Sequence, residues 1–171
     1  HLSLRRQRQM CIRDRLDIKP IYFRRFGAEI WRHSMQVAFL TSELSEEDRD
    51  TAFLLGLLHD VGKLAIFKML LDAFVQAEPG EQPNSWLFRQ VMTAKSLTLS
   101  ALLAKHWQLP STFETELDKL AHVHTRPNEG IAAVVWRSNI ISEISMLQQA
   151  GKLPADMLSN LLALVGLEPA Q

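Results

Sequence analysis

Residues 56–64 read Gly56-Leu57-Leu58-His59-Asp60-Val61-Gly62-Lys63-Leu64, and this stretch is the most informative feature of the sequence. It places adjacent imidazole and carboxylate side chains at the polar end of a leucine-rich helical segment. A second histidine, His33, stands in another helical pattern upstream. Imidazole and carboxylate together suit a hard or borderline divalent ion, so the three residues form a candidate metal site if the two helices pack side by side. The alternative is that His59 is a hydrogen-bonded core histidine and Asp60 caps backbone donors.

Composition limits the class of protein. The 171 residues are 47% hydrophobic and 22% charged, which is typical of one globular domain. The net charge is zero, but residues 1–25 hold eight Lys/Arg against two Asp/Glu, so the rest of the chain is acidic. An acidic body lacks the basic surface that holds a nucleic-acid backbone, and we expect no nucleic-acid partner. No apolar run approaches the roughly 20 residues of a membrane span. With one cysteine, Cys11, and no secretory leader pattern, we expect a cytoplasmic protein without disulfides.

The first fifteen residues differ from the rest. Residues 1–15 carry five arginines without helical or strand periodicity. We interpret them as an extraneous or disordered basic head, and we expect the domain itself over residues 16–171. The alternative is a basic arm that binds an anionic partner.

The body shows helical patterning throughout. Apolar residues recur at helical spacing over residues 22–44. Ser45-Glu46-Glu47-Asp48 predicts an N-cap at Ser45 for a helix that ends at His59, and Gly62 predicts a helix end. No segment has the alternating β-branched runs of a sheet, so the prediction is an all-α bundle of six to seven helices. Further helices are expected over residues 64–77, 86–107, 112–124, 129–149 and 154–165, with an exposed loop at 78–84. Large apolar side chains dominate core packing, so we expect four tryptophans to anchor it: Trp31, Trp86, Trp107 and Trp136.

Three segments together resemble a known family. They are Trp31-Arg32-His33-Ser34-Met35-Gln36-Val37-Ala38, the run from Ala52 to Leu64, and Leu102-Leu103 followed by Trp107-Gln108-Leu109-Pro110. This pattern is similar to the HDOD domain, the HD-related output domain of bacterial signalling proteins, over roughly residues 22–145. The resemblance implies an HD-superfamily-like bundle. It begins partway through the family's domain, so we expect the family's N-terminal helices to be missing and the chain to be a C-terminal part of a longer protein.

The resemblance also implies a set of site residues. Catalytic HD phosphohydrolases hold one or two divalent ions with a histidine, a His-Asp pair and a distant aspartate. His33, His59 and Asp60 match the first three positions, whereas Asn139 stands at the fourth. A neutral amide is a weaker ligand, so the implied pocket is degenerate; Mg, Mn or Fe would be the candidate ions, and we assign no cofactor. In catalytic relatives the residue matching Lys63 approaches a substrate phosphate. Its alternative is a solvated charge beyond a helix end.

A later histidine pair is harder to interpret. His122 and His124 stand approximately where the related HD-GYP cyclic dinucleotide phosphodiesterases have histidine ligands, and we include both in the candidate pocket. Residues i and i+2 of a helix face different ways, so we favour helix-end histidines over ligands of one ion. Another expected histidine is replaced within Lys95-Ser96-Leu97, and the sequence has no Gly-Tyr-Pro motif.

Taken as a whole, the resemblance implies a regulatory signal-transduction domain rather than an enzyme. It would act through contacts with signalling proteins or with fused sensory and output domains. The alternative is a metal-dependent HD phosphohydrolase that acts on nucleotides or cyclic dinucleotides. A third interpretation is a structural remnant that folds poorly alone, with exposed apolar surface on its first helix.

Overall fold

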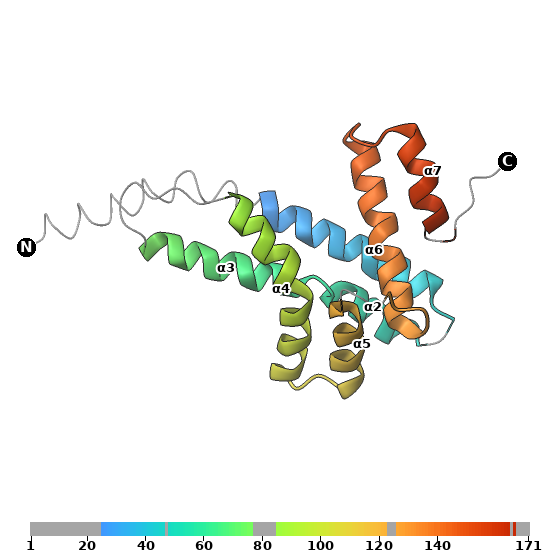
Figure 1. Ribbon diagram of the computed structural model, residues 1–171. Helices are drawn as coiled ribbons and strands as arrows, with labels where there is room; N and C mark the ends of the chain where they lie inside the picture. Colours follow the sequence, from blue (N-terminus) through green and yellow to red (C-terminus); the bar gives the residue numbers. More distant parts are fainter. Residues whose placement is uncertain (1–24, 47, 77–84, 123–125, 165, 167–171) are drawn as a thin grey trace, which may run out of the picture.

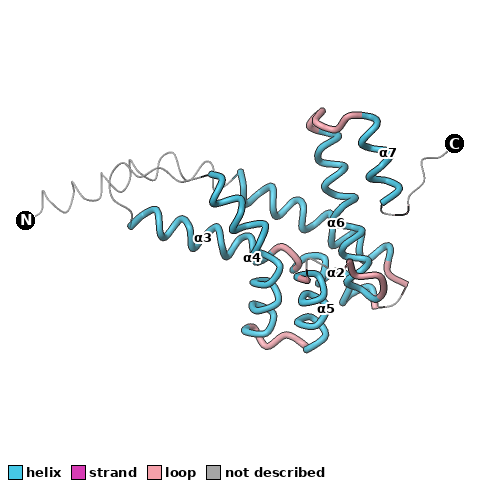
Figure 2. The backbone as a smooth tube through the Cα atoms, viewed as in Figure 1, coloured by secondary structure: helices cyan, strands magenta, loops and turns pink. Residues whose placement is uncertain are grey.

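The protein is a bundle of helices. The computed structural model describes residues 25–46, 48–76, 85–122, 126–164 and 166. These residues contain no β-strand, and the predicted all-α class is confirmed (Figure 2). The predicted basic head, the loop at 78–84 and His124 lie outside the described residues. A helix over residues 25–44 is followed by α2 (Arg49–Leu58), α3 (Val61–Gln76), α4 (Ser85–His106), α5 (Ser111–Ala121), α6 (Gly130–Gln149) and α7 (Ala155–Leu164).

Two helices, α4 and α6, each pack against several others. Helix α4 lies against both α3 and α5, and α6 lies against α2, α5 and α7 (Figure 1). The helix over residues 25–44 crosses α2 at Gly56, where a Cβ atom would lie 2.7 Å from the Cα atom of Ala38. Only glycine permits this close approach of two backbones. Among the described helices, none is long and apolar enough to cross a membrane.

Two of the predicted local signals are wrong in position. Helix α2 is capped by Asp48, whose carboxylate accepts a hydrogen bond from the Thr51 amide at 3.1 Å, and not by Ser45. Asp48 is the N-cap, rather than Ser45, because it stands directly before the first helical residue. From that position a short side chain reaches the free amides of the first turn. Gly62 does not end a helix. It lies in the first turn of α3, where it allows close packing against α4.

A polar layer separates two apolar clusters. One cluster contains Val37, Leu55, Leu117 and Val135, and the other contains Ile30, Ile66 and Met92. The polar layer arises because each contributing helix carries buried polar residues between its apolar ones. Ile30 and Val37 flank His33, Leu55 and Ile66 flank the His59-Asp60 pair, and Met92 and Ala101 flank two buried serines, Ser96 and Ser100. At these helical spacings the polar residues lie on the same buried helix faces as the apolar core residues.

The expectation that the tryptophans anchor the core is wrong for two of them. Trp31 is 55% exposed and Trp107 is 48% exposed. Trp136 is partly buried, with the guanidinium of Arg126 4.0 Å from its ring centroid. The side chain of Trp86 lies outside the described residues.

Candidate metal centre

Three helical segments bring the predicted residues together. His33 comes from the middle of the helix over residues 25–44, Asn139 comes from α6, and His59 and Asp60 form the short connection between α2 and α3. Only 4% of His33 and 2% each of His59 and Asp60 are exposed. Because α2 ends at Leu58 and α3 begins at Val61, the adjacent His59 and Asp60 side chains are not held on different faces of one helix.

Ser100 holds this connection in place from α4. Its hydroxyl lies 2.7 Å from the carbonyl oxygen of His59, to which it donates, and accepts from the amide of Gly62 at 2.9 Å. The same hydroxyl is 3.1 Å from the carbonyl oxygen of Ser96. These bonds satisfy buried backbone groups at the end of α2 and at the start of α3, where helices leave such groups unpaired. Ser100 therefore fixes the backbone that carries His59 and Asp60.

The hydrogen bonds of His33 define where its proton lies. Ser142 donates its hydroxyl proton to Gln36 Oε1 at 2.9 Å, so its oxygen is free to accept from His33 Nδ1, also at 2.9 Å. These two hydrogen bonds place the proton of neutral His33 on Nδ1. Nε2 lies 2.8 Å from Asn139 Oδ1, to which it donates only when the ring is protonated. In the neutral ring its lone pair faces that oxygen, and a cation between the two would relieve their repulsion. Burial lowers the pKa of His33 below its ordinary value, and the neighbouring Asp60 carboxylate opposes this shift without cancelling it.

His59 is oriented in the same way. Its Nδ1 atom lies 2.6 Å from the carbonyl oxygen of Gly56, which can only accept, so Nδ1 carries a proton. In the neutral ring Nε2 then carries a lone pair and no proton. This nitrogen lies 3.2 Å from Asn139 Oδ1. The Nδ2 group of Asn139 donates to Glu143 Oε1 at 3.3 Å, which fixes the amide with its oxygen toward the two histidines.

Four electron-pair donors therefore converge on one point: His33 Nε2, His59 Nε2, Asp60 Oδ2 and Asn139 Oδ1. The Asp60 oxygen lies 3.5 Å from each of the two histidine nitrogens. Ligand atoms of His33, His59 and Asp60 all lie within 4.8 Å of one another. An ion with bonds of about 2.1 Å to nitrogen and oxygen separates neighbouring ligand atoms by roughly 3.0–3.4 Å. The residues thus fit a divalent ion in donor type and in spacing.

Asp60 already has a cationic partner. The Nζ atom of Lys63 lies 2.6 Å from Asp60 Oδ2, one turn along α3. Burial alone would raise the pKa of Asp60, but the charges of His59 and Lys63 and the hydrogen bond from Lys63 outweigh burial and hold that pKa below its ordinary value. Asp60 is therefore an ionised carboxylate at neutral pH.

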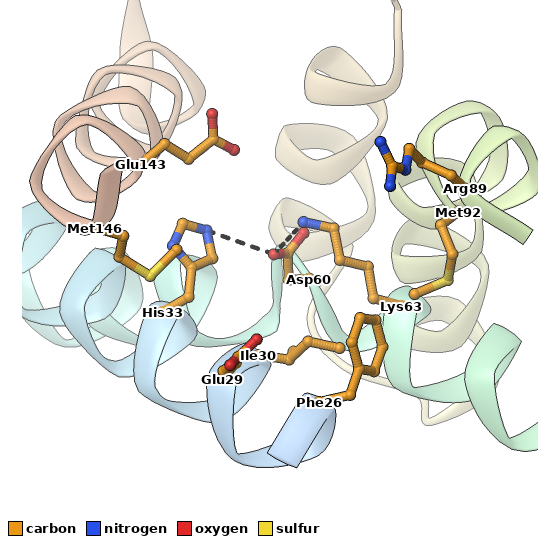
Figure 3. A pocket seen from close by; sticks show the side chains of 10 residues that line it. All are labelled: Phe26, Glu29, Ile30, His33, Asp60, Lys63, Arg89, Met92, Glu143 and Met146. Atoms are coloured by element: carbon orange, nitrogen blue, oxygen red, sulfur yellow. Dashed lines mark hydrogen bonds and ion pairs between the residues drawn. The ribbon is translucent and has the colours of Figure 1, made fainter. Parts of the chain in front are cut away.

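A cavity of about 440 Å³ opens beside this cluster. Figure 3 shows Asp60 at its centre, with His33 on one side and the ammonium of Lys63 on the other. Arg89 of α4 adds a second cation to the wall. The remaining lining residues are two acids, Glu29 and Glu143, and four apolar side chains, Phe26, Ile30, Met92 and Met146.

The structure places the predicted pocket residues in two locations. Lys63 and Asn139 contact the cluster of His33, His59 and Asp60. His122 is exposed at the end of α5, where its Nδ1 donates to the carbonyl oxygen of Asp118 at 2.7 Å. It lines a separate cavity with Lys119 and Arg126. His124 lies outside the described residues.

Sequence reasoning missed several contributors to the site. Ser142 is one turn beyond Asn139, and Gln36 is one turn beyond His33, so helical spacing from the predicted residues could have found both. Ser100 and Arg89 offered no such signal. Both come from α4, and only the tertiary packing of α4 on α3 brings them near the site.

Comparison with known proteins identifies the family of the chain. The HDOD domain model matches residues 20–124, a span that includes His33, His59 and Asp60. The chain has no match among curated proteins or among solved structures. The matched segment covers more than half of the chain, from the helix over residues 25–44 through α5. The chain therefore belongs to the HDOD domain family.

Proposed function

We propose that this chain is a regulatory HDOD domain that transmits signals through protein contacts, with a degenerate metal pocket and no hydrolytic activity of its own. Its partners would be signalling proteins or fused sensory and output domains, inside the cell. The observation that carries the proposal is the charge of the four converging ligand side chains, His33, His59, Asp60 and Asn139, which we call the polar centre. Asp60 is the one carboxylate among these four, Lys63 pairs with that carboxylate at 2.6 Å, and Asn139 adds no charge.

A ligand set with one carboxylate, which already pairs with Lys63, suits a regulatory role better than hydrolysis. Metal-assisted hydrolysis of a phosphoester needs an ion held firmly enough to lower the pKa of a bound water and to polarise the phosphoryl oxygen. Carboxylates supply most of the charge that retains Mg²⁺ or Mn²⁺. If a divalent ion binds this chain, His33, His59, Asp60 and Asn139 would hold it, and it would supply Lewis-acid chemistry at the cavity. The neutral ligand Asn139 weakens that hold.

Exposed aromatic side chains support the protein-contact part of the proposal. Trp31 is 55% exposed and Phe39 is 59% exposed, and both lie on the helix over residues 25–44. Phe39 packs edge-on against Phe53 of α2, with the ring centroids 5.3 Å apart. Large aromatic residues are enriched where protein surfaces bind one another. This outer face lies on the same helix as His33, so a partner bound there would contact the helix that helps to build the polar centre.

A metal-dependent phosphohydrolase is the second candidate, and one observation favours it. Lys63 and Arg89 line the cavity beside four convergent electron-pair donors, an arrangement that could hold a phosphate group near an ion. The two candidates differ in what they predict for turnover. A regulatory domain hydrolyses nothing at this site, whereas a phosphohydrolase of nucleotides or cyclic dinucleotides loses its activity with the ligands.

The experiment compares the purified wild-type chain with a His59→Ala/Asp60→Ala variant. Both are assayed with Mg²⁺, Mn²⁺ or Fe²⁺ against nucleotides, cyclic dinucleotides and a generic phosphodiester. We expect equal, background hydrolysis from the two proteins. Turnover by the wild type that disappears in the variant would refute the regulatory proposal and establish the phosphohydrolase.

The protein-contact part needs its own test, because absence of hydrolysis alone does not demonstrate signalling. We would cross-link the tagged domain in its host cell and compare Trp31→Glu with Met69→Glu, a control that adds the same charge at an exposed position of α3. Loss of a specific cross-linked protein in Trp31→Glu alone is the expected result. An identical set of cross-linked proteins from wild type and Trp31→Glu would contradict a contact at this face.

A further inference from the structure

The ammonium of Lys63 contacts the one oxygen that a metal ion would need most. Asp60 Oδ2 lies 2.6 Å from Lys63 Nζ, and the same oxygen lies 3.5 Å from the Nε2 atoms of His33 and His59. The side chain of Asp60 is 3% exposed, whereas that of Lys63 is 28% exposed. The lysine therefore reaches from the cavity onto a buried carboxylate.

We propose that Lys63 is the resident cation of this centre and competes with divalent ions for Asp60. The ammonium must leave Asp60 Oδ2 before an ion binds between the two histidines. The inference rests on the proposed function, because it supplies a reason for a pocket that keeps its ligands and lacks hydrolytic chemistry.

The competition follows from charge and from geometry. An ammonium and a divalent cation both seek the lone pairs of the same carboxylate oxygen. An ion held by that oxygen would place two positive charges beside the positive charge of Lys63, in a site shielded from water where repulsion is strong. In the metal-free protein the same pairing is favourable, because a buried carboxylate without a partner is costly. Lys63 thus stabilises the metal-free state specifically.

The cavity gives the displaced side chain a place to go. Lys63 lines the cavity together with two acids, Glu29 and Glu143, of which Glu143 also accepts from the Asn139 amide (Figure 3). The partial exposure of Lys63 means that its ammonium can exchange Asp60 for these acids or for water without crossing the core. Competition, rather than a permanent block, is the expected behaviour.

The test is a titration of the whole chain with Co²⁺, followed by its visible absorption, which reports coordination directly. Lys63→Met removes the charge and keeps an unbranched side chain of similar length. Lys68→Met is the matched control, because Lys68 lies on the same helix, is exposed and forms a surface ion pair with Asp72 at 3.3 Å. We expect Lys63→Met to bind Co²⁺ about tenfold more tightly than wild type, and Lys68→Met to match wild type within about twofold.

Two further variants tie the effect to the site. Lys63→Arg retains the cation and is expected to bind Co²⁺ as weakly as wild type. Adding His59→Ala to Lys63→Met is expected to abolish the gain. If Lys63→Met folds poorly by circular dichroism, Lys63→Gln replaces it with a neutral side chain of different packing.

The proposal is overturned if Lys63→Met or Lys63→Gln, once folded, binds Co²⁺ no more tightly than wild type, including the case in which none of them binds. This result is separate from the fate of the proposed function. Hydrolysis by the wild-type chain would refute the regulatory function but leave the order of Co²⁺ affinities intact. An unchanged order of affinities would remove the role of Lys63 but leave the hydrolysis comparison as it is.

Discussion

Gly62 and Ser96 lie closer together than any side chain at position 62 would allow. A Cβ atom on Gly62 would overlap the carbonyl oxygen of Ser96 and would lie 2.9 Å from the backbone nitrogen of Ser100. Both obstacles are helical backbone of α4, so neither can move without shifting the helix. Close contact at this point is what allows Ser100 to reach the connection that carries His59 and Asp60.

Gly62→Ala should therefore destabilise the fold severely. We expect a loss of about 3 kcal/mol or more in the free energy of unfolding, because the contact is with backbone and cannot be relieved by a rotamer change. Urea denaturation followed by circular dichroism measures it. Gly27→Ala is the matched control: Gly27 is helical with nothing within 4 Å of an added Cβ atom, so alanine should raise stability by about 0.5–1 kcal/mol. Equal effects of the two substitutions would disprove the close-contact argument.

Two serines of α6 should respond in opposite directions to alanine. Ser138 is fully buried, and its hydroxyl has no hydrogen-bond partner among the described residues. Ser138→Ala removes an unpaired polar group and should raise the free energy of unfolding by about 1 kcal/mol. Ser142 instead accepts from His33 and donates to Gln36, so Ser142→Ala should lower that free energy by about 1–3 kcal/mol. Thermal melts of both variants measure the two changes in stability. Destabilisation by Ser138→Ala would show that the Ser138 hydroxyl has a partner after all.

Acid should weaken the metal-free protein below about pH 6.5. Burial lowers the pKa of His33, so in this range the unfolded chain binds a proton that the folded chain excludes. Stability must then fall as the pH falls, by up to about 1.4 kcal/mol for each pH unit from this group. Asp60 adds nothing to this slope, since its pKa is held below its ordinary value and it stays ionised here.

Urea unfolding in EDTA at several values between about pH 7.5 and about pH 5.5 measures that slope. His33→Gln should be less stable throughout but should lose the contribution of His33 to the slope. His106→Gln, which replaces an exposed histidine, is the matched control. A slope that survives in His33→Gln would assign the acid sensitivity to another group.

Glu116 of α5 should stabilise the start of α6, the helix that carries Asn139. Its Oε2 atom accepts from the Ala132 amide at 2.8 Å in the first turn of α6, where Glu129 provides no side-chain cap. The carboxylate is buried and complements the positive end of the helix dipole. Glu116→Ala should lower the free energy of unfolding by about 1–3 kcal/mol, and Glu116→Gln by less, because an amide oxygen can still accept. Chemical denaturation checks this, and Glu114→Ala, which removes an exposed pair with Lys105, should change stability little by comparison.

The helices were predictable because their signals are local. Apolar spacing locates the helix over residues 25–44 and α4 to within a few residues, since burial of one helical face requires that spacing. The cap of α2 was misplaced, because Ser45 and Asp48 are both good capping residues and only the path of the chain decides between them. The role of Gly62 was misread for a related reason. A glycine required by helix packing and a glycine required by a helix end look alike in sequence.

The site was predictable only in part. The resemblance to a family pointed to His33, His59, Asp60 and Asn139, which the structure brings together. It gave no indication that Lys63 contacts Asp60 directly, because the pattern alone is equally consistent with a solvated charge. Ser100 could not be found at all. A single serine in an apolar helix becomes informative only once the packing of α4 against the start of α3 is known.

The HDOD match ends at residue 124, but Asn139 and Ser142, whose side chains face the two nitrogens of the His33 ring, stand beyond it, 106 and 109 residues along the chain from that histidine. The boundary of the recognisable pattern is therefore not the boundary of the hydrogen-bonded unit. During synthesis the polar centre can close only after α6 has left the ribosome, because long-range contacts wait for the last segment that makes them. A fragment trimmed to the matched segment would leave the His33 ring without the Ser142 hydroxyl that accepts from Nδ1 and without Asn139 beside Nε2. In this chain the side chains around His33 therefore come together late, and only in a chain that includes α6.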